Sequence, residues 1–299
     1  MSLTTLKDAE AQMLEFGLRI ELLELDGRYH RAPFMDERRS RMSGYYKLRE
    51  IDRKDEILVD GIFGSFKVSE RPLVTDRRVS ISLSDQRMDE IKKEYMRKLD
   101  IQREEEKDAH EMAAQRASLI WEDASEEGAS PYLLRKKVQS YGLRFYKNSI
   151  VVPMVKEGRL TSLQSIAANG FKKYLPGGDI KGAMHIIKGS SRVALCEGYA
   201  TGASIHEATG WSVAICFTAN GLVSCAPYFK KKDVVICSDN DLATKDKIGK
   251  NVGLDAAKRA AQYLGCSVFV PEIDDLTLSD FNDVHVRHGL EEVRKQCKI

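Results

Sequence analysis

Three acidic residues follow short apolar runs in the C-terminal part of the chain. Glu197 comes directly after VALC, and Asp239 and Asp241 come after VVIC, in the sequence CSDND. Residues two apart in an extended chain point the same way, so Asp239 and Asp241 can face one ion. Neighbouring strands lie about 4.8 Å apart, so all three carboxylates converge if the two strands are adjacent. A divalent cation relieves the repulsion in such a cluster, and Mg²⁺ prefers a few carboxylates completed by water and phosphate oxygens.

An acidic pair of this kind also caps turns, and on its own it would favour that interpretation. Two further features favour an ion site. The sequence LSDFNDV supplies Asp280 and Asp283 just before the final predicted helix, as indirect or second-metal ligands. Residues 128–190 contain eleven Lys and Arg residues and two acidic ones, a net charge of +9. Local positive charge of this size attracts a polyanion, although a solvated basic surface would have the same composition.

Short apolar strands alternate with helices from about residue 190 onwards. Strands are predicted at 193–196, 212–216, 234–238 and 267–272, with helices between them and at the C-terminus. This alternation predicts a mostly parallel sheet that is covered on both faces. Such sheets bind ligands beyond the carboxyl ends of their strands, which is where the three acids stand. Upstream, SIVVPMV is predicted to be a strand that turns at KEGR, and LTSLQSIAANG and FKKYLPGG a further strand pair.

The N-terminal part has a different pattern. Residues 1–75 are mostly β in prediction, with turns at Asp26-Gly27 and Asp60-Gly61. Aromatic residues interleaved with arginines suit single-stranded nucleic acid, and aromatic residues in a small β unit also commonly form its core. Residues 85–124 contain no Gly or Pro and predict a long charged helix, a spacer or docking arm. The sequence SEEGASPY then marks a boundary.

Composition limits the class of protein. With 299 residues, 42% hydrophobic and 31% charged, the chain suits two or three compact units. Its apolar runs are too short to cross a membrane, and its N-terminus lacks the pattern of a secretory signal. We therefore expect a cytoplasmic protein with no membrane partner. None of the six cysteines forms a C-x-x-C pair, so we expect reduced thiols and no zinc.

The motifs occur in an order that resembles the Toprim-domain DNA primases, bacterial DnaG-like enzymes, in their plasmid and bacteriophage branch. CEGYATG, CSDND, the helix with Gly253 and SDFNDV resemble the Toprim domain, and SIVVPMV to KYLPGG resembles the basic subdomain before it. The resemblance covers about residues 128–295, and more weakly 1–75. It implies an α/β Toprim catalytic domain with a Rossmann-like, mostly parallel sheet, preceded by a basic α+β subdomain. The implied division begins with a β-rich domain that is expected to bind nucleic acid (residues 1–78) and a long charged helix or linker (79–127). The basic subdomain (128–190) and the Toprim domain (191–299) follow.

The resemblance also implies roles for individual residues. Glu197 matches a glutamate that acts as acid/base or metal ligand, and Asp239 and Asp241 match a metal-binding pair. Asp280 and Asp283 match a downstream acidic motif. The basic residues expected to hold nucleotide phosphates or the template are Lys173, Lys181, Arg159, Lys172, Arg135, Lys136 and Lys137.

The implied function is a DNA primase that makes short RNA on single-stranded DNA from nucleoside triphosphates, with Mg²⁺ or Mn²⁺. A replicative helicase in trans is the expected partner. The chain lacks the cysteine-rich zinc ribbon common in such primases and has no GxxxxGK[ST] motif of a fused helicase. Two alternatives use the same residues: a metal-dependent Toprim nuclease or nickase, and a non-catalytic DNA-binding factor of replication or recombination.

Overall fold

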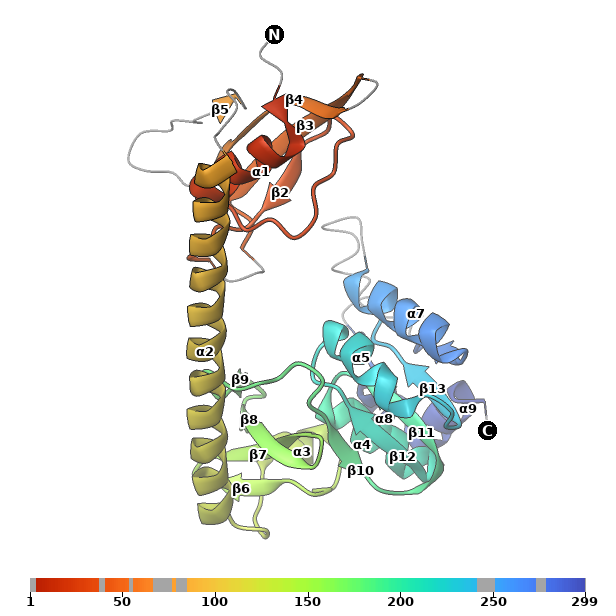
Figure 1. Ribbon diagram of the computed structural model, residues 1–299. Helices are drawn as coiled ribbons and strands as arrows, with labels where there is room; N and C mark the ends of the chain where they lie inside the picture. Colours follow the sequence, from red (N-terminus) through yellow and green to blue (C-terminus); the bar gives the residue numbers. More distant parts are fainter. Residues whose placement is uncertain are drawn as a thin grey trace. The chain divides into compact units, whose positions relative to one another are not determined.

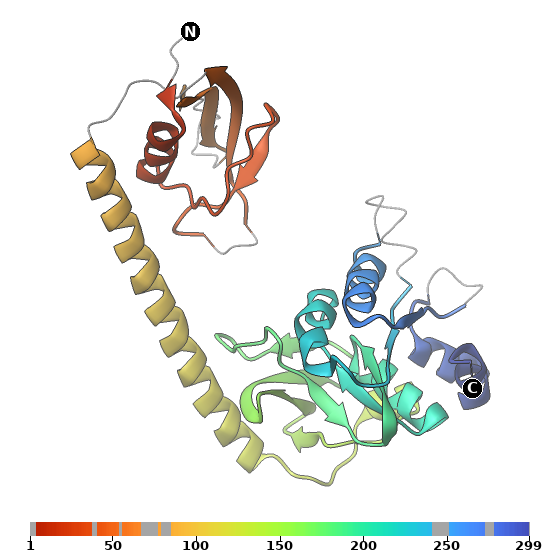
Figure 2. The same ribbon diagram turned by 45° about the vertical axis from the view of Figure 1, so that its right-hand side comes forward.

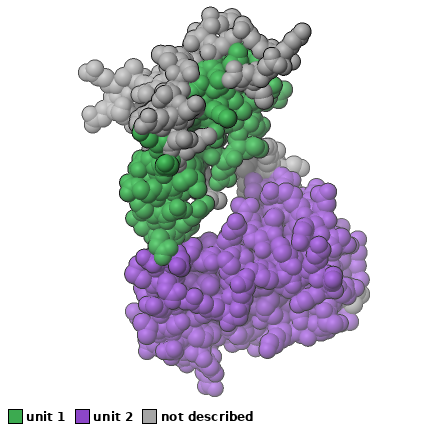
Figure 3. Space-filling model, in the orientation of Figure 1, with its two compact units in different colours: residues 1–106 green, residues 107–299 purple. Residues whose placement is uncertain are grey.

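The structure is a computed structural model that describes residues 4–37, 41–53, 56–66, 77–78, 85–240, 251–272 and 278–298 (Figure 1). The chain divides into two compact units, residues 1–106 and 107–299 (Figure 3). The helix α2 (Asp85–Asp123) contributes residues to both units, and it confirms the predicted long helix. Among the described helices, none is long and apolar enough to cross a membrane.

Within the described residues, the first unit is an antiparallel sheet of five strands with one helix on one face (Figures 1 and 2). The strand order is β1-β4-β3-β2, and β5 also pairs with β4. Ala9 and Met13 of the helix pack against Tyr46, Leu48 and Phe63 of the sheet. The elements are β1 (Thr4–Thr5), α1 (Leu6–Glu15), β2 (His30–Ala32), β3 (Gly44–Arg53), β4 (Glu56–Ser65) and β5 (Arg77–Arg78).

The helix α1 was missing from the predicted mostly-β pattern. The hydroxyl of Thr5 accepts a hydrogen bond from the backbone N–H of Asp8 at 3.1 Å and donates one to its carboxylate at 2.8 Å. A threonine followed three residues later by an acid is a helix-start signal. The start of α1 could therefore be read from Thr5 and Asp8. The helix was missed because the residues after it alternate in the way typical of strands.

Both turns predicted in the first unit are wrong. Asp26-Gly27 joins no two strands, because residues 20–25 form no strand and Asp26 makes a single bridge to Arg49 of β3. Asp60-Gly61 lies inside β4. A Cβ atom on Gly61 would lie 2.0 Å from the carbonyl oxygen of Lys47. This glycine therefore serves close approach of two paired strands, a common use of glycine inside a strand.

The second unit begins with a small antiparallel sheet in the order β6-β7-β8-β9. The predicted turn at KEGR is confirmed: Glu157 and Gly158 have φ of 52° and 80° and connect β7 to β8. Two residues with positive φ are what a tight two-residue hairpin requires. The elements are α3 (Pro131–Lys136), β6 (Arg144–Tyr146), β7 (Ser149–Lys156), β8 (Arg159–Ala167) and β9 (Lys172–Tyr174).

A second sheet follows in the order β10-β12-β11-β13-β14. The strand β10 is antiparallel to its neighbour and the other pairs are parallel, which confirms the predicted mostly parallel sheet. The strands are β10 (His185–Ile187), β11 (Ser190–Cys196), β12 (Trp211–Ile215), β13 (Val234–Cys237) and β14 (Ser267–Phe269). The helices are α4 (Tyr199–Thr209), α5 (Ala219–Cys225), the 3₁₀ turn η1 (Ala226–Phe229), α7 (Val252–Leu264), α8 (Phe281–His288) and α9 (Leu290–Gln296).

Alternate residues of each parallel strand enter two different hydrophobic cores. In β11, Ala194 and Cys196 belong to the core that includes α4 and α8, while Val193 and Leu195 belong to the core with α5 and α7. Side chains alternate between the faces of a strand, so both faces must be apolar. This explains why these strands have uninterrupted apolar sequences. The core with α4 also includes residues of β7 and β8, so the two sheets share one interior.

Packing of α4 on the sheet depends on Gly202 in the CEGYATG motif. A Cβ atom at this position would lie 2.8 Å from Cγ1 of Ile215 and 3.0 Å from Sγ of Cys196. Both neighbours belong to the buried core, where there is little room to move. The glycine lets α4 lie close to β11 and β12, and so fixes the residues just after Cys196.

We predict that Gly202→Ala destabilises the second unit by about 1–3 kcal/mol, because the added methyl group overpacks the core. Urea denaturation followed by circular dichroism measures the change. Gly210→Asn at the other end of α4 is the matched control: Gly210 has φ of 70° and nothing within 4 Å of its Cβ position. Asparagine tolerates that conformation, so the control should cost less than about 1 kcal/mol. Equal losses in the two variants would contradict the packing role of Gly202.

Candidate active site

The strand order places two of the predicted acids at one edge of the parallel sheet. The strands β11 and β13 are adjacent and parallel, and Leu195 is paired with Ile236. Glu197 follows Leu195 by two residues and Asp239 follows Ile236 by three, so both stand beyond the carboxyl ends of neighbouring strands. Asp241, the third predicted acid, lies outside the described residues.

The thiol of Cys196 shows which charged groups converge there. Burial raises its pKa well above the usual range, and the carboxylates of Asp239, Glu197 and Asp280 raise it further, in that order. The ammonium group of Lys172 acts in the opposite direction. The four charged groups come from four separate segments of the sequence, and each lies near enough to the thiol to act on its pKa. Carboxylates that follow β11 and β13, a third at the start of α8 and one lysine of β9 are therefore neighbours of the same buried residue.

Asp280 and Asp283 precede the final helix α9, as expected, and they begin α8, a helix that was not predicted from the sequence. They form a capping box, in which the N–H of Asp283 donates to Oδ1 of Asp280 at 2.8 Å. Oδ2 of Asp283 accepts from the N–H groups of Asp280 and Ser279 at 3.3 and 2.9 Å. The hydroxyl of Thr201, in the first turn of α4, donates to Oδ2 of Asp280 at 3.1 Å. Both acids thus make hydrogen bonds that stabilise the start of α8. Asp280 is also one of the three carboxylates that raise the pKa of Cys196.

The start of α7 lies against Glu197. Gly253 is the second residue of this helix, and a Cβ atom there would lie 3.2 Å from Oε1 of Glu197. The buried Asn251 caps the helix by accepting from the N–H of Leu254 at 3.0 Å. The N-terminus of a helix stabilises negative charge. Sequence reasoning assigned no role to Asn251; an asparagine before an apolar periodic run is the signal that could have identified the cap.

Lys172 reaches the cluster because β9 is attached to the end of β12. The hydroxyl of Tyr174 donates to the carbonyl oxygen of Phe217 at 2.9 Å. Burial raises the pKa of Tyr174, and the charge of Glu197 raises it further. A Cβ atom on Gly198 would lie 3.6 Å from Nζ of Lys172. Of the lysines expected to bind phosphates, Lys172 therefore lies next to the Glu197-Gly198 segment.

Three other basic residues of this region, Lys173, Lys181 and Arg159, are exposed at the surface. Lys173 is exposed and, by strand alternation, points to the opposite side of β9 from Lys172. Lys181 is exposed in a turn after β9. Arg159, at the predicted turn, binds both carboxylate oxygens of Glu111 in α2 at 2.6 and 2.7 Å.

The basic residues of α3 attach this helix to its surroundings. Nζ of Lys136 lies 3.4 Å from Oδ1 of Asp283, and Lys137 donates to the carbonyl oxygen of Val286 at 3.0 Å. The guanidinium group of Arg135 donates to a backbone carbonyl just after β8 at 3.0 Å. Lys136 and Lys137 therefore position α8, and with it the acids at its start.

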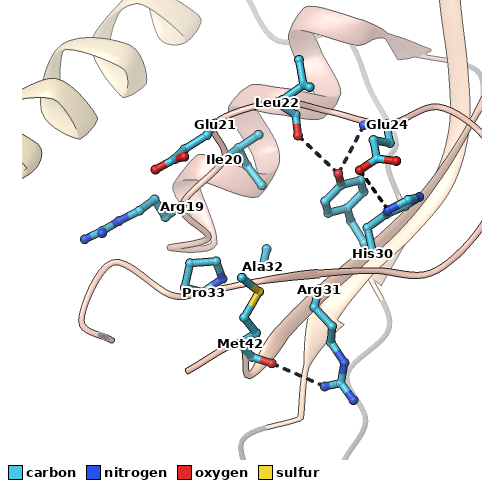
Figure 4. A pocket seen from close by; sticks show the side chains of 11 residues that line it. Arg19, Ile20, Glu21, Leu22, Glu24, His30, Arg31, Ala32, Pro33 and Met42 are labelled. Atoms are coloured by element: carbon cyan, nitrogen blue, oxygen red, sulfur yellow. Dashed lines mark hydrogen bonds and ion pairs between the residues drawn. The ribbon is translucent and has the colours of Figure 1, made fainter. Parts of the chain in front are cut away.

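Among the described residues, one group of side chains has ligand atoms close enough together to hold a metal ion, and it lies in the first unit: Glu24, Asp26 and His30. Nε2 of His30 lies 2.7 Å from Oδ1 of Asp26. Nδ1 lies 3.5 Å from Oε1 of Glu24, a contact drawn in Figure 4. The ring also stacks on Tyr46 at 5.3 Å. The ring of His30 thus lies between the two acids, and its Nε2 is at hydrogen-bond distance from Asp26.

Comparison with known families decides what the second unit is. Residues 192–291 match the family model described as the Toprim domain. The chain contains a Toprim domain. Glu197, Asp239, Asp280 and Asp283 all lie within the matched residues. The site assembled at the edge of the parallel sheet is therefore the acidic edge of this Toprim domain.

Two curated relatives of the chain are named as DNA primases. It is 26% identical over 262 residues, 83% of its length, to a DNA primase TraC of Escherichia coli. A second DNA primase TraC of Escherichia coli is 29% identical over 125 residues, 38% of this chain. The chain spans only 18% and 12% of the length of these two curated relatives. The expected resemblance to Toprim primases is confirmed.

Among solved structures, the chain is similar to the Aquifex aeolicus primase with its zinc-binding and RNA polymerase domains. The identity is 15% and the TM-score 0.41, over 99% of this chain and 85% of that one. With a TM-score below 0.5, this likeness adds nothing to what the Toprim match establishes.

The bridging histidine in the first unit makes a pH-dependent prediction. A hydrogen bond from His30 lowers the pKa of Asp26, with a smaller effect from the backbone of Arg28. A carboxyl group whose pKa is lower in the folded state stabilises the fold above its unfolded pKa of about 3.9, and loses that effect as the pH falls. His30→Leu should therefore raise the pKa of Asp26 towards its ordinary value.

An NMR titration of the Asp26 carboxyl carbon measures this shift. Arg28→Gln is the control, because it keeps the backbone N–H that donates to Asp26 at 2.9 Å and should leave the pKa nearly unchanged. An unaltered Asp26 pKa in His30→Leu would show that the bridge does not form.

Proposed function

We propose that this chain carries the nucleotidyl-transfer activity of a DNA primase, making short RNA primers on single-stranded DNA. The observation that carries the proposal is the set of carboxylates at the edge of the Toprim sheet, with Lys172 beside them. The similarity to a DNA primase TraC over 83% of the chain supports it. Phosphoryl transfer asks mainly for positioning and for neutralisation of charge, and acids beside a lysine suit both tasks.

The carboxylates suit a divalent cation, Mg²⁺ or Mn²⁺. Glu197, Asp239 and Asp280 would hold it, and we propose Asp241 as a further ligand. Their convergence around the Cys196 thiol supports this assignment, because hard oxygen ligands are what such ions prefer. The bound ion would neutralise the phosphates of the incoming nucleotide and lower the barrier to attack by the 3′-hydroxyl.

The remaining residues would bind and orient the substrates. Lys172 would contact a phosphate of the nucleotide from the side of β9, while the start of α7 would stabilise the negative charge of Glu197 and hold it in place. We propose Lys173, Lys181 and Arg135 as contacts to the phosphates of the template or primer. Lys136 and Lys137 would act indirectly, since they hold α8.

We predict that Asp239→Asn lowers primer synthesis by about 100-fold or more, because the stabilisation of charge by a metal ion is worth several kcal/mol. The measurement is incorporation of labelled nucleoside triphosphates on defined single-stranded templates, with Mg²⁺ or Mn²⁺. Asp233→Asn is the matched control: Asp233 directly precedes β13, whereas Asp239 follows it, and it pairs at the surface with Arg192 at 2.8 Å. The control should keep full activity.

Normal synthesis by Asp239→Asn would mean that the site is wrongly placed. Wild-type protein that nicks plasmid DNA and incorporates no nucleotide would identify a Toprim nuclease. A metal-dependent thermal shift that Asp239→Asn removes would separate both enzymes from a non-catalytic DNA-binding factor.

Lys172 provides a second prediction. Lys172→Ala should raise the KM for nucleoside triphosphates about tenfold, because a hydrogen bond to a charged group is worth about 1.5–3 kcal/mol. Lys188→Ala is the control, since Lys188 is exposed just before β11, at the opposite end of the sheet from the acids. Steady-state kinetics at saturating template measures KM and kcat separately. An unchanged KM in Lys172→Ala would remove this lysine from the nucleotide site.

A further inference from the structure

The sheet of the first unit has one face turned away from α1. In β3, Tyr46 and Leu48 point into the core with α1. Side chains alternate along a strand, so Tyr45, Lys47 and Arg49 lie on the other face. Lys47 and Arg49 are exposed. This face therefore carries positive charge where the opposite face carries the core.

The strand register adds further residues to the same face. Arg31 of β2 is paired with Tyr45, and Ile62 of β4 is paired with Lys47. Tyr29 precedes Arg31 by two residues, and Phe66 lies two residues beyond the partner of Tyr45 in β4, so both rings belong to this side. We call Tyr29, Arg31, Lys47, Arg49 and Phe66 the aromatic–basic face.

Two rings of this face are exposed and fixed in place. Tyr29 is 61% exposed and Phe66 is 42% exposed, whereas Tyr45 between them is 1% exposed. The ring centroids of Tyr29 and Tyr45 are 5.8 Å apart, and those of Tyr45 and Phe66 are 4.5 Å apart. Tyr45 thus supports both outer rings. Aromatic rings held this way offer flat apolar surface that loses little conformational entropy when a partner binds.

Positive charges accompany the rings. Nζ of Lys47 lies 5.2 Å from the centre of the Tyr29 ring, and the guanidinium group of Arg31 lies 3.9 Å from that of Phe66. Arg31 is also within reach of the Met42 carbonyl oxygen, at 3.5 Å (Figure 4). Arg49 pairs with Asp60 at 3.6 Å and keeps 60% of its side chain exposed. Asp60 itself has a side chain only 13% exposed, so the surface that a ligand meets is cationic.

The face is hollowed between these groups. A pocket of about 410 Å³ is lined by Tyr29, Lys47, Arg49, Asp60 and Ile62, among others. Its lining combines one aromatic ring, the apolar side chain of Ile62, two cations and the carboxylate of Asp60, which is paired with Arg49. The ring and the cations suit a planar apolar group that is attached to an anion. Each nucleotide of a single strand combines an exposed base with a phosphate in this way.

We propose that the aromatic–basic face binds single-stranded nucleic acid. Bases stack on Tyr29 and Phe66, and phosphates contact Lys47 and Arg49. A duplex hides the faces of its bases from the rings, and an acidic peptide matches the charge and leaves the rings unused. The proposal goes beyond the proposed function, because the face belongs to the first unit and uses no residue of the Toprim site.

The first test compares two substitutions of one residue in the full-length chain, without nucleotides or divalent ions. The probes are fluorescein-labelled twelve-nucleotide single-stranded DNA and RNA of one sequence, and binding is followed by anisotropy. Tyr29→Leu keeps apolar bulk and loses the ring, and should weaken binding about fivefold or more, as expected from stacking energies. Tyr29→Phe keeps the ring and should bind like the wild type. The DNA and RNA arms identify the preferred strand.

Other parts of the chain can also bind nucleic acid, so the contact is mapped directly. A probe with 5-iodouracil is cross-linked by light, and the modified peptides are identified by mass spectrometry. The expected adduct lies on the peptide that contains Tyr29, and it disappears in Tyr29→Leu. No adduct near Tyr29 or Phe66, equal affinity of Tyr29→Leu and wild type, or equal competition by polyglutamate would overturn the proposal.

Salt dependence tests the role of the phosphates. Lys47→Gln and Arg49→Gln should each reduce the slope of log K against log salt by about 0.7, the value for one neutralised phosphate of a single strand. Arg28→Gln is the control: its side chain is 86% exposed in the same unit and lies 4.0 Å from the carboxylate of Asp26. An effect of Arg28→Gln as large as that of Lys47→Gln would contradict a specific face. Asp239→Asn should leave this binding intact, so failure here and failure of the proposed synthesis are distinguishable.

Discussion

Repulsion between carboxylates at the end of a parallel sheet is the constraint on which the second unit depends. Glu197, Asp239 and Asp280 all raise the pKa of one buried thiol, and like charges that share one edge of a sheet repel unless other groups offset them. The structure supplies several such groups: Lys172 on one side, the N-terminus of α7 against Glu197, and the hydroxyl of Thr201 on Asp280. The strand β9 and the helices α4 and α7 hold these three groups near the acids.

The small antiparallel sheet contributes to the Toprim edge through contacts that link distant parts of the sequence. Tyr174 ties β9 to the end of β12, which carries Lys172 to the acids. On another side, Lys136 contacts Asp283, and the side chain of Asn282 donates to the carbonyl oxygen of Lys136 at 2.7 Å. Because β7 and β8 share a core with β11, movement of this sheet would disturb the acidic edge directly. The division into a basic subdomain and a Toprim domain at residue 190 remains a proposal.

The pattern of apolar residues along the sequence predicted the elements whose structure depends mainly on residues close together in the chain. Uninterrupted apolar runs identified the parallel strands, and with them the positions of Glu197 and Asp239, because both faces of that sheet are buried. Asp60-Gly61 was assigned to a turn by composition, while the reason for the glycine is the Lys47 carbonyl of a paired strand. Lys172 rather than Lys173 lies near Glu197 because of the face of β9 that is turned towards the parallel sheet. Contacts of this kind come from chain segments far apart and leave no local pattern.

The two acids at the start of α8 differ in how many of their carboxylate oxygens are used in hydrogen bonds and ion pairs. Asp283 directs Oδ2 to two backbone N–H groups and Oδ1 to Lys136, so both of its oxygens serve the start of the helix and the attachment of α3. Asp280 accepts one N–H on Oδ1 and one hydroxyl on Oδ2, and its charge also reaches the Cys196 thiol. A carboxylate has about four acceptor sites, so Asp280 keeps the capacity to bind an ion while capping the helix. The capping box therefore fixes the geometry of the acid better suited to be a ligand, and Asp283 is the residue that makes this geometry rigid.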